Sequence, residues 1–389
     1  MLASSITASI AWTYRFRSCL DPPGRKPGNQ GLAPGICMLN WQDTYQLSRF
    51  VLIRTSDKGF VLESPLTNTR FPVAGASVFR ILEALNQPRR LDALLDAVAE
   101  EQRAAVKSFI ETCDNAGLLT RVGANGLTEE ETSSLSHWEV HDLLFHASSR
   151  MGRNRKPIGG TYRLRSRVPP EPPICPPPTG TREWLALPRP PFEDANEPLF
   201  NHVMHARRSA HLLNPLRIEI LGEFLHRTCS ITKASGEGDS AFIQKVYPSG
   251  GSLHPLRVYA AVSACKGCDP GLYLYREPEH ALVLIRGLDS SVQRLLSDAR
   301  DAAGGLPANP PVLLIISARF RRTAWKYESI AYRLILLEAG ALFQTMYLVA
   351  TAMGLKGCAL GCGDSDHFAR TIASDYYTET SVAEFMLGS

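Results

Sequence analysis

The 389-residue sequence lacks the features that mark several classes of protein. Its formal net charge of +4 is small for this length, and no block of one charge stands out, which argues against nucleic-acid binding. Its most apolar run, Ala339 to Leu355, is about 17 residues long, short of the roughly 20 that span a bilayer, and favours a buried core helix. No basic segment precedes an apolar stretch near the N-terminus, so we expect no secretory signal.

The cysteines are few and scattered. Their number, nine, is odd and their spacing is wide, which does not fit a secreted disulfide scaffold. A reducing cytoplasm is therefore the simplest compartment. Cys265 and Cys268 form a lone Cys-x-x-Cys motif without the second pair that a zinc ribbon needs, and the Asp-Pro-Gly turn after it does not favour a redox pair. We predict no metal site.

The N-terminal half divides into three predicted segments. Residues 1–37 are loop-like and indicate a disordered extension ahead of a functional start at Met38, with a targeting peptide as the alternative. Residues 38–125 combine a strand hairpin, three helices and a closing strand, which predicts a winged-helix-like domain that is either a structural cap or a peptide- or partner-binding module. Residues 126–198 hold a linker helix and then a Pro-rich segment, which is a linker or a surface wrap.

Residues 199–389 alternate between helical and strand patterns. Residues 312–317 form a fully apolar strand, and a long helix is predicted from Tyr327 to Met353, with Gly354 as its C-cap. The fold class is therefore α+β, with a central mixed sheet flanked by helices.

Four motifs in this half carry candidate chemistry. Arg207–His211 puts two guanidinium groups beside a hydroxyl, which suits a phosphate monoester, although a solvated helix end is the alternative. Tyr247–Pro255 contains two glycines that let the backbone approach a flat ligand, unless they merely form a tight turn. Lys326 stands beside Tyr327, so its ammonium could stabilise a phenolate that accepts a proton. Gly354–Gly363 is predicted to be a glycine-rich loop that could cover a cofactor.

The order and spacing of these motifs resemble the SagB/ThcOx-type azoline dehydrogenases, a branch of the nitroreductase family. That branch carries Arg-Arg-Ser, then Ser-Gly-Gly-x-x-His-Pro, a Gly-Leu-Tyr-x-Tyr strand matched by residues 271–275, and Lys-Tyr. Next come Ala-Tyr-Arg-Leu-x-x-x-Glu-Ala-Gly, matched by residues 331–340, and a Gly-Leu-x-x-Cys loop. The resemblance covers residues 38–389 and is strongest in the C-terminal half. It departs at Ser329-Ile330, where the branch has a more basic residue, which puts substrate choice in doubt more than flavin binding.

The resemblance implies a nitroreductase-like FMN-binding fold and an FMN-dependent oxidation of a peptide thiazoline or oxazoline to the aromatic ring. It implies a homodimer, a precursor peptide as substrate and a cyclodehydratase as partner. Lys326 and Tyr327 match the catalytic pair. The residues that match the FMN site are Arg207, Arg208, Ser209, His211, Ser249, Gly250, Gly251, Gly357, Cys358, Leu360 and Gly361. The alternatives are an NAD(P)H-dependent nitroreductase of small molecules and a non-catalytic scaffold that recruits peptide.

Overall fold

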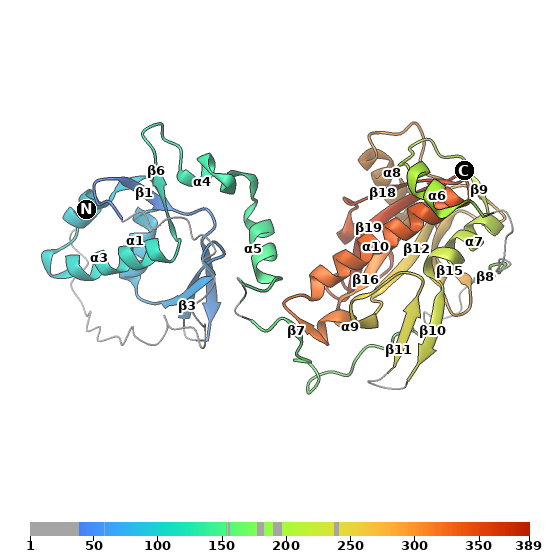
Figure 1. The fold of residues 1–389 in the computed structure, drawn as a ribbon, viewed down its shortest axis with the longest axis horizontal. Helices are drawn as coiled ribbons and strands as arrows, with labels where there is room; N and C mark the ends of the chain where they lie inside the picture. Colours follow the sequence, from blue (N-terminus) through green and yellow to red (C-terminus); the bar gives the residue numbers. More distant parts are fainter. Residues whose placement is uncertain are drawn as a thin grey trace. The chain divides into compact units, whose positions relative to one another are not determined.

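The computed structural model describes residues 39–57, 59–152, 154, 156–176, 183–189, 197–236 and 241–389. The predicted extension of residues 1–37 and the proposed start at Met38 lie outside these ranges. The chain divides into two compact units, with the boundary between residues 155 and 156 (Figure 1). Each unit has its own hydrophobic core.

The first unit contains two small antiparallel sheets and the three helices predicted from periodicity. The sheets have the strand orders β5-β1-β6 and β2-β3-β4. The helices bury one face each because their apolar residues recur at helical spacing, as Leu82, Leu91 and Ile110 show. The bounds are β1 Thr44–Leu47, β2 Leu52–Ser56, β3 Gly59–Ser64, β4 Thr69–Val73, α1 Ala76–Ala84, β5 Arg89–Arg90, α2 Leu91–Asp96, α3 Glu100–Asn115, β6 Leu119–Val122, α4 Glu129–Thr132, η2 Ser134–His137 and α5 Val140–Ser148.

The closing strand of the first unit pairs inside the unit. β6 runs antiparallel to β1 over its full length, from the pair Leu47–Leu119 to the pair Thr44–Val122. This pairing does not by itself define a winged helix, so the winged-helix-like assignment stays a prediction. The predicted linker helix is α5, which belongs to this unit.

The second unit is built on a seven-stranded sheet with the order β18-β19-β16-β12-β14-β15-β8. Every neighbouring pair in this sheet is antiparallel, so the prediction of a mixed sheet was wrong. Parallel neighbours need a crossover connection, whereas β12, β14 and β15 follow one another through short antiparallel connections. The bounds are β8 Trp184–Ala186, β12 Leu256–Val262, β14 Gly271–Arg276, β15 Ala281–Gly287, β16 Val312–Arg319, β18 Lys356–Leu360 and β19 Glu379–Gly388.

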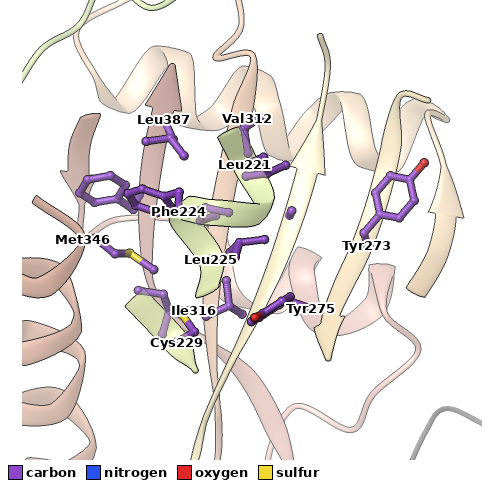
Figure 2. Packing of buried hydrophobic residues seen from close by; sticks show 14 of the residues in the cluster. Leu221, Phe224, Leu225, Cys229, Tyr273, Tyr275, Val312, Ile316, Met346 and Leu387 are labelled. Atoms are coloured by element: carbon purple, nitrogen blue, oxygen red, sulfur yellow. The ribbon is translucent and has the colours of Figure 1, made fainter. Parts of the chain in front are cut away.

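Helices cover both faces of this sheet. α7 (Ile218–Cys229) and α10 (Ala331–Ala352) pack on one face, as Figure 2 shows for Leu221, Phe224 and Met346. α8 (Ser290–Ala302) and α11 (Ser365–Thr371) pack on the other face. Because both faces are covered, β16 is buried along its whole length, which explains its uninterrupted apolar sequence.

The remaining elements of the second unit are short. They are β7 Gly159–Gly160, α6 Phe200–Ala206, β9 Leu216–Arg217, β10 Ile231–Ser235, β11 Phe242–Lys245, η4 Gly250–Ser252, β13 Cys265–Lys266, α9 Phe320–Ala324 and β17 Tyr327–Glu328. The described part of the Pro-rich segment is a surface wrap. Arg319 donates hydrogen bonds to the carbonyls of Pro172 (2.9 Å) and Pro173 (3.1 Å), and β8 forms an edge strand.

α10 begins later than predicted. Its first residue is Ala331, because Ser329 has a φ of 58° that no α-helix accepts, and Tyr327 lies before it in β17. Its end lies where predicted, although Met353 is the C-cap and Gly354 is the residue after it. Gly354 has a φ of 67°, and the amide of Leu355 donates to the carbonyl of Ala350 (2.7 Å), which satisfies the helix end.

Only one side of α10 is buried. Its sheet-facing residues include Ile335, Leu342 and Met346, whereas Leu337 is 61% exposed and Tyr332 is 47% exposed. By length and composition the helix could cross a membrane, and a third of its most apolar window is buried in the unit. The expectation of a buried core helix therefore holds for the sheet-facing side of α10, whereas its other side is apolar and exposed.

Candidate flavin and proton-transfer site

The second motif forms a tight turn at the edge of the core. Tyr247 is buried, and residues 250–252 form the single turn η4. Gly251 has a φ of 67°, a conformation that glycine adopts at little cost. A β-carbon at Gly250 would come within 3.0 Å of Leu334 on α10. The backbone of Gly251 therefore favours glycine, whereas a side chain at Gly250 would require only a small shift of Leu334.

Lys326 and Tyr327 lie directly against this turn. A β-carbon at Gly251 would overlap the Tyr327 hydroxyl and come within 3.0 Å of Lys326 Nζ. Lys326 Nζ is 5.2 Å from the centre of the Tyr327 ring. The structure thus brings the second and third motifs together, although 75 residues separate Gly251 from Lys326 (326 − 251) in the sequence.

A segment that sequence reasoning overlooked braces this pair. β7 pairs with β17, which sets Gly160 opposite Tyr327. The amide of Tyr162 donates to the carbonyl of Lys326 (3.1 Å), and the Tyr162 ring meets Trp325 edge-on at 5.5 Å. The only signal in the sequence was the Gly159-Gly160 pair, which is common in loops. The brace fixes the backbone of Lys326 and Tyr327.

The first motif follows α6 at the other end of α10. Arg208 and Ser209 are exposed and Arg207 is partly buried, so their donors can reach a ligand. Arg208 donates to the carbonyls of His205 and Arg207, both at 2.7 Å. In the residues that the structure describes, neither guanidinium has a carboxylate partner within ion-pair distance. His211, which follows this motif in the sequence, is also exposed.

Tyr347 connects this motif to α10 and β18. Its hydroxyl lies 2.8 Å from the Ser209 hydroxyl and accepts a hydrogen bond from the amide of Ala359 (2.8 Å). The guanidinium of Arg207 stands over its ring at 5.0 Å. The amide of Ala210 also donates to the carbonyl of Gly357 (2.9 Å). Tyr347 is a site residue that the sequence did not single out.

The predicted glycine-rich loop is largely a strand. Residues 356–360 form β18, which pairs with β19, and a β-carbon at Gly357 would overlap the Phe385 ring. Cys358 and Leu360 are buried in the core beneath α8 and α11, so only their backbone could contact a cofactor. Gly361 follows the strand and is exposed. The glycine in the strand serves core packing, which a sequence pattern does not distinguish from a loop.

The predicted residues therefore form two clusters on α10 rather than one. The turn at Ser249 reaches α10 at Glu338, and the phosphate motif reaches it at Tyr347. Nine residues separate these positions, which places them about 14 Å apart along the axis and half a turn apart around it. The two clusters thus meet α10 on opposite sides.

Burial perturbs the titration of the polar groups beneath the turn. Desolvation raises the pKa of Glu338 to about 7, against smaller lowering effects of the Ser249 hydrogen bond and the Lys245 charge. Desolvation, followed by the charges of Lys245 and Arg322, lowers the pKa of His254 to about 3. His254 is therefore neutral near neutral pH, whereas Glu338 is neutral in weakly acid solution and becomes ionised as the pH rises through about 7.

Comparison with known proteins identifies the family. The cyanobactin oxidase ThcOx model matches residues 45–155, and the nitroreductase family model matches residues 215–388. A Methanocaldococcus jannaschii protein named as a nitroreductase is 31% identical over 170 residues, which cover 43% of this chain and 81% of that protein. The chain belongs to the nitroreductase family of oxidoreductases, whose members typically bind a flavin, and carries a ThcOx-type region ahead of the nitroreductase region.

Two peptide-processing proteins are homologous to the chain. The microcin B17-processing protein McbC of Escherichia coli is 28% identical over 157 residues, covering 38% of this chain and 55% of McbC. The trifolitoxin-processing protein TfxB of Rhizobium leguminosarum bv. trifolii is 27% identical over 196 residues, covering 48% of this chain and 50% of TfxB. The chain spans about half the length of these two relatives.

The fold is also similar to solved structures. A nitroreductase-named protein from Ralstonia eutropha has a TM-score of 0.42 at 20% identity, with 57% of this chain and 96% of that chain covered. The Escherichia coli microcin synthetase McbBCD complex with truncated pro-MccB17 gives a TM-score of 0.39 at 21% identity, with 59% and 87% covered.

Proposed function

We propose that the protein is an FMN-dependent dehydrogenase that oxidises a thiazoline or oxazoline in a peptide to the aromatic thiazole or oxazole. The observation that carries the proposal is the contact of Lys326 and Tyr327 with the Gly251 turn. The homology to McbC and TfxB, whose names describe the processing of microcin B17 and trifolitoxin, supports a peptide substrate.

The residues present fit FMN. Arg207 and Arg208 would hold the phosphate, because both guanidinium groups are accessible and, among the described residues, neither is neutralised by a carboxylate. Ser209 would contact the phosphate or the ribityl chain, with His211 beside it. The turn from Ser249 to Gly251 would lie against the ring, and the backbone of β18 with Gly361 would cover its other face.

The chain's own contribution to the reaction is proton transfer and positioning. A bound flavin would supply the acceptor for the hydride that leaves the azoline ring, with molecular oxygen as the final oxidant. Tyr327 or the adjacent Lys326 would accept the acidic proton next to the carbonyl, and the other side chain would assist it. The ring thus loses one proton and one hydride, gains a double bond and becomes aromatic. The brace formed by β7 would keep the two side chains in place.

A homodimer would unite the two clusters. The uncovered face of α10 carries Leu336 and Leu337, and the neighbouring α6 exposes Phe200 and Met204. This apolar face is larger than an isolated surface residue would explain, and it fits a second copy of the chain. In such a dimer the phosphate cluster of one chain would face the Gly251 turn of the other.

The further partners follow from the substrate. An azoline must first be made from a cysteine, serine or threonine of a precursor peptide by a cyclodehydratase, so both would be partners. The first unit, which matches the ThcOx model, would be a winged-helix-like module that recruits the peptide. We place the enzyme in the cytoplasm, where peptide precursors are made.

Purification and a visible spectrum test the cofactor. The protein should be yellow, and heat should release FMN rather than FAD. Under anaerobic conditions an azoline peptide should bleach the flavin, whereas NADH should not. A colourless protein that takes up no added FMN would refute the cofactor, and rapid bleaching by NAD(P)H alone would favour a nitroreductase of small molecules.

A further inference from the structure

A buried acidic side chain lies beneath the Gly251 turn. Glu338, on the sheet-facing side of α10, is 3% exposed and accepts a hydrogen bond from the Ser249 hydroxyl. The Ser249 oxygen in turn accepts a hydrogen bond from the amide of His254 (2.9 Å). One turn earlier on α10, Leu334 packs against Gly250. Glu338 is therefore bonded to Ser249, the first residue of the turn that contacts Lys326 and Tyr327.

The other oxygen of Glu338 faces the imidazole of His254. Glu338 Oε1 and His254 Nδ1 are 3.7 Å apart, and both atoms are buried and have no hydrogen-bond partner in the described part of the structure. Unpaired buried polar atoms are costly, so two that face each other need an explanation. A single proton on Oε1 would satisfy both atoms, because the neutral carboxyl would donate to Nδ1 after a small side-chain movement.

The surrounding charges agree with a neutral carboxyl. Lys245 is engaged by Glu277 at 2.7 Å, and Arg322 donates to the carbonyls of Leu253 and Glu171. No described guanidinium or ammonium forms an ion pair with Glu338. The titratable and charged groups around the pair come from several elements and are Lys245, Tyr247, Cys229, Glu277, Arg319 and Arg322.

We propose that Glu338 is a positioning residue that carries a proton in weakly acid solution and shares it with His254, and that this hydrogen bond holds the Ser249–Gly251 turn against Lys326 and Tyr327. This proposal depends on the proposed function only for the roles given to Lys326 and Tyr327. Burial, which raises the pKa of Glu338 to about 7, agrees with the geometry. Removal of the proton would leave a charge on the buried carboxyl, require His254 to move its own proton to Nδ1 in order to donate to Oε1, and loosen the turn.

Two substitutions of matched size separate the protonated carboxyl from a carboxylate. Glu338→Gln presents a donor to Nδ1 and an acceptor to Ser249, as a neutral carboxyl does. Glu338→Met fills the space and offers neither. The test measures the melting temperature and the dissociation constant for added FMN of all three proteins on both sides of pH 7.

The expected results follow from the sign of the shift. The folded state binds the Glu338 proton more tightly than the unfolded state, so the wild type should lose stability relative to Glu338→Gln as pH rises from about 4.5 through about 7. Glu338→Gln should bind FMN as the wild type does below pH 7 and more tightly above it. Glu338→Met should bind FMN about tenfold or more weakly throughout.

A Gln variant that loses as much stability and FMN affinity as the Met variant would overturn the proposal, because that result would mean that a carboxylate is needed. So would identical pH profiles of the wild type and the Gln variant. Both readouts are independent of azoline oxidation, so a protein that behaves as expected here but leaves azolines unchanged would refute the proposed function alone. If no variant binds FMN, the melting temperatures still decide.

Discussion

Substitution of Gly251 by alanine perturbs the candidate site at one defined point. The added methyl group would overlap the Tyr327 hydroxyl and come within 3.0 Å of Lys326 Nζ. Because carbon and oxygen do not approach much closer than 3 Å, the hydroxyl must move by roughly half an ångström or more. The backbone of Gly251 has a φ of 67°, where alanine costs about 1–2 kcal/mol.

The substitution should have two separate effects, one on stability and one on the rate of the reaction. The free energy of unfolding should fall by about 1–2 kcal/mol from the backbone alone. A misplacement approaching an ångström of a reacting group can cost about 100-fold in rate, so kcat/KM for azoline oxidation should fall by up to about that factor. Gly305→Ala is the matched control. Gly305 has a similar φ of 73°, and its β-carbon would meet nothing within 4 Å, so that variant should lose similar stability and no activity.

The assay pairs urea unfolding with steady-state kinetics of both variants at equal flavin loading. The reasoning predicts similar losses of stability and a loss of activity in Gly251→Ala alone. A folded, flavin-loaded Gly251→Ala enzyme with normal kcat/KM would show that the contact with Tyr327 is irrelevant to the reaction. An equal loss of activity in Gly305→Ala would show that general destabilisation, and not the contact, lowers the rate.

Three further predictions concern other parts of the site. Tyr327→Phe and Lys326→Ala should each slow oxidation by about 10²–10⁴-fold with FMN still bound, and the double variant should lose much less than the product; near-normal turnover of either single variant would remove that residue from the mechanism. Tyr347→Phe should raise the FMN dissociation constant by roughly fivefold, measured by titration of the apoprotein. Unchanged affinity would mean that Tyr347 does not support the phosphate cluster. Leu337→Glu, in the proposed dimer interface, should give a monomer by light scattering and lower the flavin content, and an intact dimer would place the interface elsewhere.

Much of the fold follows from local signals in the sequence. The buried strand at residues 312–317 and the helix that ends at Gly354 were predictable, because apolar periodicity and a left-handed cap are local properties. The start of α10 was not, since the pattern runs on through residues 327–330 and only the backbone at Ser329 ends it. Strand order was also out of reach, because pairing such as that of β16 with β19 depends on distant residues.

The candidate site also contains some residues that the sequence identifies and others that only the structure identifies. Lys326, Tyr327 and Gly251 could be singled out because the order and spacing of their motifs resemble those of the azoline dehydrogenases, and the structure brings them into contact. Glu338 and Tyr347 looked like ordinary residues of an apolar helix, and their importance arises only from what packs against them. Gly357 was read as part of a covering loop, whereas its missing side chain makes room for Phe385.

The central claim, azoline oxidation, is tested most directly by mass spectrometry of a thiazoline-containing peptide incubated in air with the purified FMN-loaded protein. The account predicts the loss of two hydrogen atoms for each ring, no requirement for NAD(P)H, and no such loss with Tyr327→Phe on the same timescale. A peptide that keeps its mass while the enzyme oxidises NAD(P)H and reduces a small nitroaromatic compound would contradict the account.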